Sequence, residues 1–423
     1  MNGWLIFAGT LLVAMAIVSP GLRYLPLTAP LIYLTLGVAL GPSMLDLIHI
    51  HSAEYSQPLQ YVAEMSVVIA LFAAGIKMPH PFSWRLWRPP VLLATVGMAI
   101  TIAAVAAFGV TALGFSLGAA VLLGAALAPT DPVLATDVAS QHPGDRNHIR
   151  FTLTCEAGIN DGAALPFALL ALGILGLRDL GEYGSHWILF DLLYKGAAGV
   201  ALGVFYGYCL GRVVNWAKSA RAETAVYEDF LGLGLIALTY GSAEITGACG
   251  FLAVFFAAVT LRGTELGFTK ATDFVPGLAT SEAAVVSAES LAFEERLSRV
   301  TEIALVLLLG GMIDFDALTW RTLGLCAFVF FIARPLGVLL CLGTLRLPPR
   351  ARMLSSWLGL RGIGSIYYLM YALNHGFRGP EASELTQMVL IVVAASILVH
   401  GITTTPLVQR YFAQPRSTRP TAE

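Results

Sequence analysis

Apolar runs long enough to cross a membrane recur from residue 3 to residue 411. The hydrocarbon core of a bilayer needs about 20 apolar residues per helix, and the hydropathy pattern predicts about 13 such helices. The predicted spans are residues 3–20, 28–45, 59–77, 90–114, 117–140, 149–175, 187–211, 226–244, 248–262, 299–313, 320–345, 352–373 and 386–411.

Most links between the predicted spans are short. The longest link, 263–298, contains a mildly apolar, alanine-rich stretch at 278–293, where we expect a broken or interfacial helix. No basic residues or obvious cleavage site mark the first span as a signal, so we expect a retained helix. We predict one transmembrane domain, 1–411, followed by a cytoplasmic tail, 412–423.

The composition agrees with an all-α polytopic membrane protein. Only 12% of the residues are charged and the mean hydropathy is +0.75, whereas soluble domains have about 25% charged residues. The net charge of -2 indicates no nucleic-acid partner. No Walker, HExxH or GxSxG pattern occurs, so we expect a protein that is not an enzyme and uses neither nucleotide nor cofactor.

Lysine and arginine are distributed unevenly between alternate links of the predicted spans. Most of the 25 basic residues lie in alternate segments, while the intervening links hold only Arg178, Arg321 and Arg378. Cytoplasmic segments carry the excess of basic residues in membrane proteins. The pattern predicts an N-terminus outside and a C-terminus in the cytoplasm, in the plasma membrane (the inner membrane of a bacterium).

The fifth predicted span carries an aspartate between two prolines. Asp131 lies at mid-span, with Pro129 and Pro132 on either side. Proline removes a helical hydrogen bond and clashes with the preceding turn, so we expect an unwound stretch at this depth. Such a stretch is tolerated where it lines a cavity or is buried in protein, and its free carbonyl groups can face an ion.

The sixth predicted span carries two carboxylates and an amide. Glu156 and Asn160 are four residues apart and share a helix face, and Asp161 points about 100° further round. Ionisable groups at membrane depth are costly and suggest a function. A carboxylate removed from water holds its proton more readily, so it can trade that proton for a cation. An ordinary buried salt bridge is the alternative for either carboxylate.

The last spans contain arginines next to helix-breaking residues. Arg334 precedes Pro335 in the eleventh span, and Arg361 lies among glycines in the twelfth. Interruptions at corresponding places in two halves of a transporter suggest inverted repeats with two crossing discontinuous helices. We expect Arg334 to pair with Glu156, and Arg361 to compensate charge at the discontinuous helices.

These residues together resemble the monovalent cation/proton antiporters, in the sodium/proton exchanger branch with NhaP-like bacterial members. The matching pieces occur in family order over residues 3–411. They are Thr130-Asp131-Pro132, Glu156-x-x-x-Asn160-Asp161, residues 250–263 (GFLAVFFAAVTLRG), Arg334, residues 359–362 (GLRG) and residues 396–407 (SILVHGITTTPL).

The resemblance implies a homodimer of 13-helix protomers with the NhaA/NhaP-like antiporter fold. It implies a core bundle at approximately 90–175 and 320–411, a dimerisation bundle at approximately 3–77 and 226–313, and a linker helix at approximately 187–211. The core bundle would move against the dimerisation bundle.

The resemblance also implies roles for single residues. Asp161 would bind the monovalent cation and the proton, with Asp131 and Thr130 at the crossing as the other cation-site residues. Asn160 would hold the crossing together, and Glu156 with Arg334 would form a structural ion pair. The asparagine-aspartate pair is similar to that of the electroneutral branch, which implies 1:1 exchange.

Other polar residues keep more than one interpretation. Asp137 either lies in a funnel that attracts cations or sits at a solvated helix end. Some relatives have a serine directly after the glutamate, where this chain has Ala157. Some relatives also have a carboxylate in the third span near residues 71–76, where this chain has Ala73 and Ala74, and Glu64 is a candidate substitute. Thr154 and Cys155 also stay open as additional ligands.

We predict a secondary antiporter that exchanges Na+, or alternatively Li+ or K+, for H+ by alternating access and so supports pH homeostasis. A cation channel or a cation-coupled symporter is the first alternative. An intramembrane aspartyl protease that uses Asp131 and Asp161 is a second one. The protease leaves Arg334, Arg361 and the paired interruptions unexplained.

Overall fold

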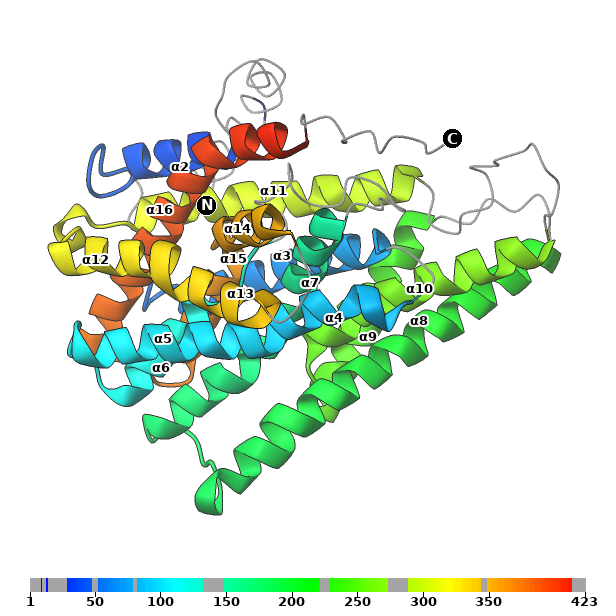
Figure 1. Cartoon of the computed structure of the whole chain (residues 1–423), viewed down its shortest axis with the longest axis horizontal. Coiled ribbons are helices and arrows are strands. Elements are labelled where there is room, and N and C mark those ends of the chain that lie inside the picture. Colours follow the sequence, from blue (N-terminus) through cyan, green and yellow to red (C-terminus); the bar gives the residue numbers. More distant parts are fainter. Residues whose placement is uncertain are drawn as a thin grey trace, which may run out of the picture.

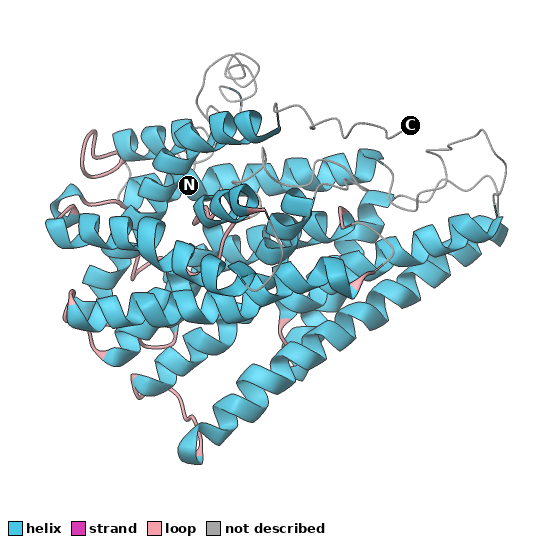
Figure 2. Cartoon of the chain, viewed as in Figure 1, coloured by secondary structure: helices cyan, strands magenta, loops and turns pink. Residues whose placement is uncertain are grey.

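The computed structural model describes residues 29–47, 52–78, 82–131, 148–220, 228–272, 288–343 and 348–412, and the single positions 9 and 13. The regular elements in these ranges are all helical (Figure 2). The α-helices are α2 (Ala29–Leu40), α3 (Ser56–Ile76), α4 (Trp84–Leu92), α5 (Met98–Thr111), α6 (Leu117–Leu127), α7 (His148–Ile174), α8 (Lys195–Ala220), α9 (Glu228–Thr246), α10 (Gly250–Thr272), α11 (Ala288–Met312), α12 (Trp320–Phe328), α13 (Arg334–Gly343), α14 (Pro349–Trp357), α15 (Ile363–Asn374) and α16 (Pro380–Phe412). Shorter 3-10 or π elements are η1 (Leu93–Gly97), η2 (Glu182–Gly184), η3 (Trp187–Tyr194), η5 (Phe315–Ala317) and η6 (Val329–Ala333).

Within the described ranges, six continuous helical stretches are long and apolar enough to cross a membrane. They are Ser56–Ile76, Trp84–Thr111, His148–Ile174, Glu182–Trp216, Trp320–Gly343 and Pro380–Tyr411. Four shorter apolar helices accompany them, at Ala29–Leu40, Leu117–Leu127, Phe230–Thr246 and Gly250–Thr264. Almost all of the predicted span 3–20, residues 132–140 of the span 117–140, and the tail after residue 412 lie outside the described residues.

The long link after the ninth span differs from the prediction. Helix α10 continues to Thr272 and α11 already begins at Ala288, so residues 288–298 belong to a long helix. Residues 273–287, which include most of the stretch 278–293, lie outside the described residues. The hydropathy pattern limits both predicted spans at the charged residues of the link: the ninth span at its end and the tenth at its beginning. The helices extend further because helical hydrogen bonds form in polar sequence as well. One of these charges, Glu295 of α11, is paired with Lys77 beyond the end of α3 at 2.5 Å.

Helix α3 lies at the centre of the packing. It packs against α10, α11 and α15, so a helix of the predicted dimerisation bundle touches a helix of the predicted core. Helix α8 runs along one edge of the molecule beside α10 (Figure 1). Helices α5, α6 and α7 pack in sequence, and α2 packs against α11.

Two helices contain π-helical turns next to prolines. The turn η1 follows Pro89 and Pro90 of α4, and η6 precedes Pro335. Proline leaves a helical carbonyl without its usual donor, and π turns of this kind often occur at functional sites. Helix α13, which follows η6, packs directly against η1. The two irregular stretches thus lie on helices that are in contact.

Candidate functional site

Two non-helical segments meet in the interior of the bundle. Helix α6 ends at Leu127, before Pro129, and a second gap separates α14 from α15 at residues 358–362. The backbone N–H of Asp131 donates a hydrogen bond to the Leu360 carbonyl at 2.9 Å. The N–H of Ile363, the first residue of α15, donates to Asp131 Oδ2 at 2.8 Å. The carboxylate of Asp131 therefore lies at the N-terminal end of α15, where the helix dipole favours negative charge.

Arg361 joins the same two segments from the other side. Its side chain is fully buried, and its guanidinium donates hydrogen bonds to the carbonyls of Ala128 and, at 3.1 Å, Pro129. Its backbone N–H donates to Ser396 Oγ of α16 at 2.9 Å. The carbonyl groups at the end of α6 carry partial negative charge. A cation at this position offsets that charge, as expected for Arg361 from the sequence.

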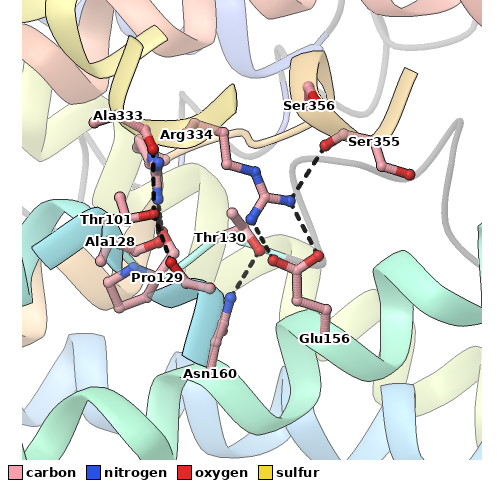
Figure 3. Close-up of polar contacts among 12 residues, drawn as sticks. Thr101, Ala128, Pro129, Thr130, Glu156, Asn160, Ala333, Arg334, Ser355 and Ser356 are labelled. Atoms are coloured by element: carbon pink, nitrogen blue, oxygen red, sulfur yellow. Dashed lines mark hydrogen bonds and ion pairs between the residues drawn. The ribbon is translucent and has the colours of Figure 1, made fainter. Parts of the chain in front are cut away.

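Asn160 connects α7 to the crossing. Its Nδ2 donates a hydrogen bond to Thr130 Oγ1 at 2.8 Å (Figure 3). Its Oδ1 is buried and accepts no hydrogen bond from the described residues. One side of the amide therefore holds the non-helical segment, while the other side offers a free acceptor oxygen.

Asp161 follows directly on α7 and is buried. The hydroxyl of Tyr368 on α15 donates to the main-chain carbonyl of Asp161, which fixes α15 against α7. A methyl group added to Gly364 would lie 2.5 Å from Asp161 Oδ1, so the carboxylate rests against the bare backbone of α15. Asp131 also acts electrostatically on Asp161.

Two carboxylates that interact away from water repel each other when both are ionised. The repulsion is relieved when a cation lies between them or when one of them takes a proton. The pair formed by Asp131 and Asp161 can therefore exchange one kind of positive charge for the other.

Glu156 and Arg334 form a second buried cluster. Arg334 Nη1 contacts Glu156 Oε1, and Nη2 donates to Oε2 at 3.0 Å (Figure 3). The same Nη2 also donates to the Ser355 carbonyl of α14 at 3.3 Å. The forked geometry joins α7, α13 and α14 one turn from Asn160. The pairing of Glu156 with Arg334 agrees with the expectation from the sequence.

The remaining candidates make other contacts, lie beside the site on α7, or fall outside the described residues. Glu64 on α3 accepts hydrogen bonds from Tyr240 at 2.5 Å and from Gln60 at 3.5 Å. Thr154 and Cys155 are buried on α7. Asp137 falls in 132–147, outside the described residues.

Three contacts of the site were not expected from the sequence. They come from the Tyr368 hydroxyl, the Ser396 hydroxyl and the main-chain carbonyl of Ser355. All three groups are uncharged, and neither hydropathy nor charge in a span distinguishes them from ordinary helix residues. Tyr368 does lie in the apolar run that follows the GLRG motif, and Ser396 is the first residue of the stretch 396–407.

The comparison with protein families gives one match over nearly the whole chain. Residues 9–410 match the model of the sodium/hydrogen exchanger, transmembrane, family. A "Na(+)/H(+) antiporter 2" from Zygosaccharomyces rouxii is 31% identical over 205 residues, covering 46% of this chain and 25% of that protein. The "K(+)/H(+) antiporter NhaP" of Alkalimonas amylolytica is 24% identical over 384 residues, covering 89% of this chain and 61% of that protein. The chain thus spans less than two thirds of the length of these relatives.

Solved structures show the same fold. The sodium proton antiporter MjNhaP1 from Methanocaldococcus jannaschii at pH 8 superposes with a TM-score of 0.73 and 19% identity, covering 97% of this chain and 99% of that one. An electron-microscopy map of the same antiporter gives a TM-score of 0.76 and 18% identity. At this level of identity the likeness concerns the fold, and it confirms the antiporter fold predicted from the sequence. With a family match from residue 9 to residue 410, this multi-pass membrane protein belongs to the sodium/hydrogen exchanger family.

Proposed function

We propose that this protein is a secondary transporter that exchanges a monovalent cation for H+ by alternating access. The observation that carries the proposal is the buried pair of carboxylates, Asp131 and Asp161, at the meeting point of two non-helical segments. A cation that enters relieves their repulsion and displaces the proton. When the cation leaves, a proton returns, because two bare carboxylates in a low dielectric are unfavourable.

In this proposal Asp161 binds the cation and the proton competitively. Asp131 is held by the N–H of Ile363 and contributes charge from the crossing. Thr130 and Asn160 hold the crossing against α7 through their 2.8 Å hydrogen bond, and the free Oδ1 of Asn160 faces the buried interior as a neutral acceptor. Because Asn160 carries no charge of its own, one proton balances one cation, which makes the exchange electroneutral.

The cation in the proposal is Na+, with K+ and Li+ as alternatives. The relatives include both Na+/H+ and K+/H+ antiporters by name, so the family match alone does not select the ion. We further propose a homodimer in the plasma membrane with the N-terminus outside and the C-terminus in the cytoplasm. The asymmetric distribution of lysine and arginine along the sequence supports this orientation.

The proposal is tested in proteoliposomes that enclose a pH-sensitive dye. Na+, Li+ and K+ are added in turn, with the membrane potential either clamped or free. Proton movement driven by one or more of these cations and independent of the potential is the expected result. Cation current without proton movement would instead identify a channel. A lack of proton movement with every cation between about pH 6 and pH 9 would overturn the antiporter proposal.

Replacing the central carboxylate tests the site. Asp161→Asn removes the charge with almost no change of shape, and we expect it to abolish exchange while the protein still folds. Asp316→Asn is the matched control, because Asp316 is exposed in η5 and should leave exchange unchanged. Exchange at the normal rate by Asp161→Asn would rule out Asp161 as the binding carboxylate.

A further inference from the structure

Helix α11 carries a buried carboxylate that the proposed mechanism has not used. Only 5% of Glu302 is exposed, and within the described part of the chain its carboxyl group makes no hydrogen bond or ion pair. An ionised side chain buried without a partner is costly, and in membrane proteins such residues mark ion pathways. Without such a partner the carboxyl group of Glu302 holds a proton, and a cation that reaches it can take the place of that proton.

The position of Glu302 along the bundle is fixed by its neighbour. Thr301 Oγ1 and Ser66 Oγ are 2.8 Å apart, and Ser66 lies in the middle of the 21-residue helix α3. Seven residues earlier on α11, Glu295 pairs with Lys77 just beyond the end of α3. Glu302 thus lies two helical turns inside the bundle, near mid-depth, whereas Glu295 marks its end.

Among the described residues, Asp131 and Arg299 lie near enough for their charges to act on Glu302. Arg299 lies about one turn earlier on the same helix and forms no ion pair with it in this structure. On α2, Tyr33 also interacts electrostatically with Glu302. Helix α11 packs against α2, α3, α15 and α16, and α15 begins at the residue whose N–H binds Asp131. Glu302 therefore lies on a helix of the predicted dimerisation bundle that packs against α15, near the crossing.

We infer that Glu302 is a third cation-binding carboxylate, which holds the transported monovalent cation opposite Asp131 before the cation settles at Asp161. The inference rests on the proposed exchange function and extends it across the boundary between the two predicted bundles. A cation between Glu302 and Asp131 has carboxylate oxygens on two sides. When the crossing moves relative to α11, the cation leaves Glu302 and stays with the aspartates.

An alternative is a purely structural role for Glu302. A structural carboxylate in a membrane bundle is normally tied to a fixed donor, as Glu156 is tied to Arg334. Glu302 has no such donor among the described residues. Its two acceptor oxygens are thus available to a mobile cation in a way that those of Glu156 are not.

The inference is tested by cation binding, which does not depend on transport. Purified wild-type protein and the Glu302→Gln, Glu302→Asp and Glu295→Gln variants are titrated with NaCl, and in parallel with KCl, by calorimetry in detergent at pH 8. Choline chloride at the same ionic strength controls for screening. Removing a nearby carboxylate weakens the attraction for the cation, and we expect Glu302→Gln to raise the apparent Kd about tenfold. Glu302→Asp keeps the charge and should stay within about threefold of wild type.

Glu295→Gln is the matched control, since it lies two turns away on the same helix and serves a fixed ion pair with Lys77. It should bind cations as wild type does. Wild-type affinity in Glu302→Gln would overturn the inference, as would a melting temperature that falls with no change in Kd. If Glu302→Gln does not fold, an affinity of Glu302→Asp more than tenfold weaker than that of wild type overturns the inference, and near-wild-type affinity supports it. If wild type binds a cation but moves no protons, the exchange proposal fails and the binding data still decide the role of Glu302.

Discussion

Removing one partner of the ion pair between Glu156 and Arg334 should destabilise the protein strongly. The pair joins three helices, and the side chains of Arg334 and Glu156 are only 8% and 2% exposed. Nη1 and Nη2 of Arg334 each donate a hydrogen bond to one carboxylate oxygen of Glu156. Breaking a buried pair by removing one partner typically costs about 3–5 kcal/mol, because the remaining charge is buried without compensation. Glu156→Gln and Arg334→Met should each show a loss of this size.

The double variant distinguishes a charge effect from a packing effect. When both charges are removed, no uncompensated charge is left, and such replacements are often neutral or stabilising. We therefore expect Glu156→Gln/Arg334→Met to be more stable than either single variant. The measurement is unfolding followed by tryptophan fluorescence in detergent, analysed as a double-mutant cycle. The expected coupling energy is about 3 kcal/mol or more.

A matched surface pair serves as the control. Arg321 and Glu384 are 2.9 Å apart, but their side chains are 50% and 42% exposed. Exposed pairs contribute about 0–1 kcal/mol, so Glu384→Gln should change stability little. Two results would refute the reasoning: Glu156→Gln that unfolds like wild type, or a double variant whose loss equals the sum of the single losses.

Two further substitutions test the crossing. Gly362→Ala would place a methyl group 2.6 Å from the Cβ of Asp131, whose carboxylate is already held in place; we expect a loss of about 1–3 kcal/mol and severely slowed exchange. Gly234→Ala is the control, because a methyl group there would have no atom within 4 Å, and it should change neither stability nor exchange. If Gly362→Ala and Gly234→Ala behaved alike in melting and dye assays, the proposed contact of Gly362 with Asp131 would be contradicted. Asn160→Ala removes the hydrogen bond to Thr130 and should cost about 0.5–1.5 kcal/mol while it slows exchange. A variant with a wild-type exchange rate would show that this bond does not hold the crossing in the transport cycle.

The sequence predicted the location of the crossing because its causes are local. Pro129 stops α6, and the glycines around Arg361 separate α14 from α15. Charged residues in apolar spans are rare enough to identify Asp131, Asp161 and the two partners of the ion pair. These features are visible in a single sequence, since each depends on a few neighbouring residues.

Other features depend on contacts between distant segments and were not visible. The hydroxyl groups of Tyr368 and Ser396 resemble any other polar residue of a helix until the fold places them at Asp161 and Arg361. Glu302 was passed over because the hydropathy pattern placed it near the beginning of a span. The long helix α11 instead carries it into the middle of the bundle. The sequence also predicted the end of α10 too early and the beginning of α11 too late, because hydropathy does not report helical hydrogen bonding.

The central claim is that one cation and one proton compete for Asp161. Calorimetric titration of the purified protein with Na+ or K+ between about pH 6 and pH 9, repeated in buffers of different ionisation enthalpy, measures both the Kd and the protons released. We expect the apparent Kd to fall as the pH rises, by up to about tenfold per unit while the site is mostly protonated, with up to one proton released per bound cation. Asp161→Asn should lose this linkage. An apparent Kd that does not depend on pH, with no proton released, would contradict competition and with it the proposed exchange mechanism.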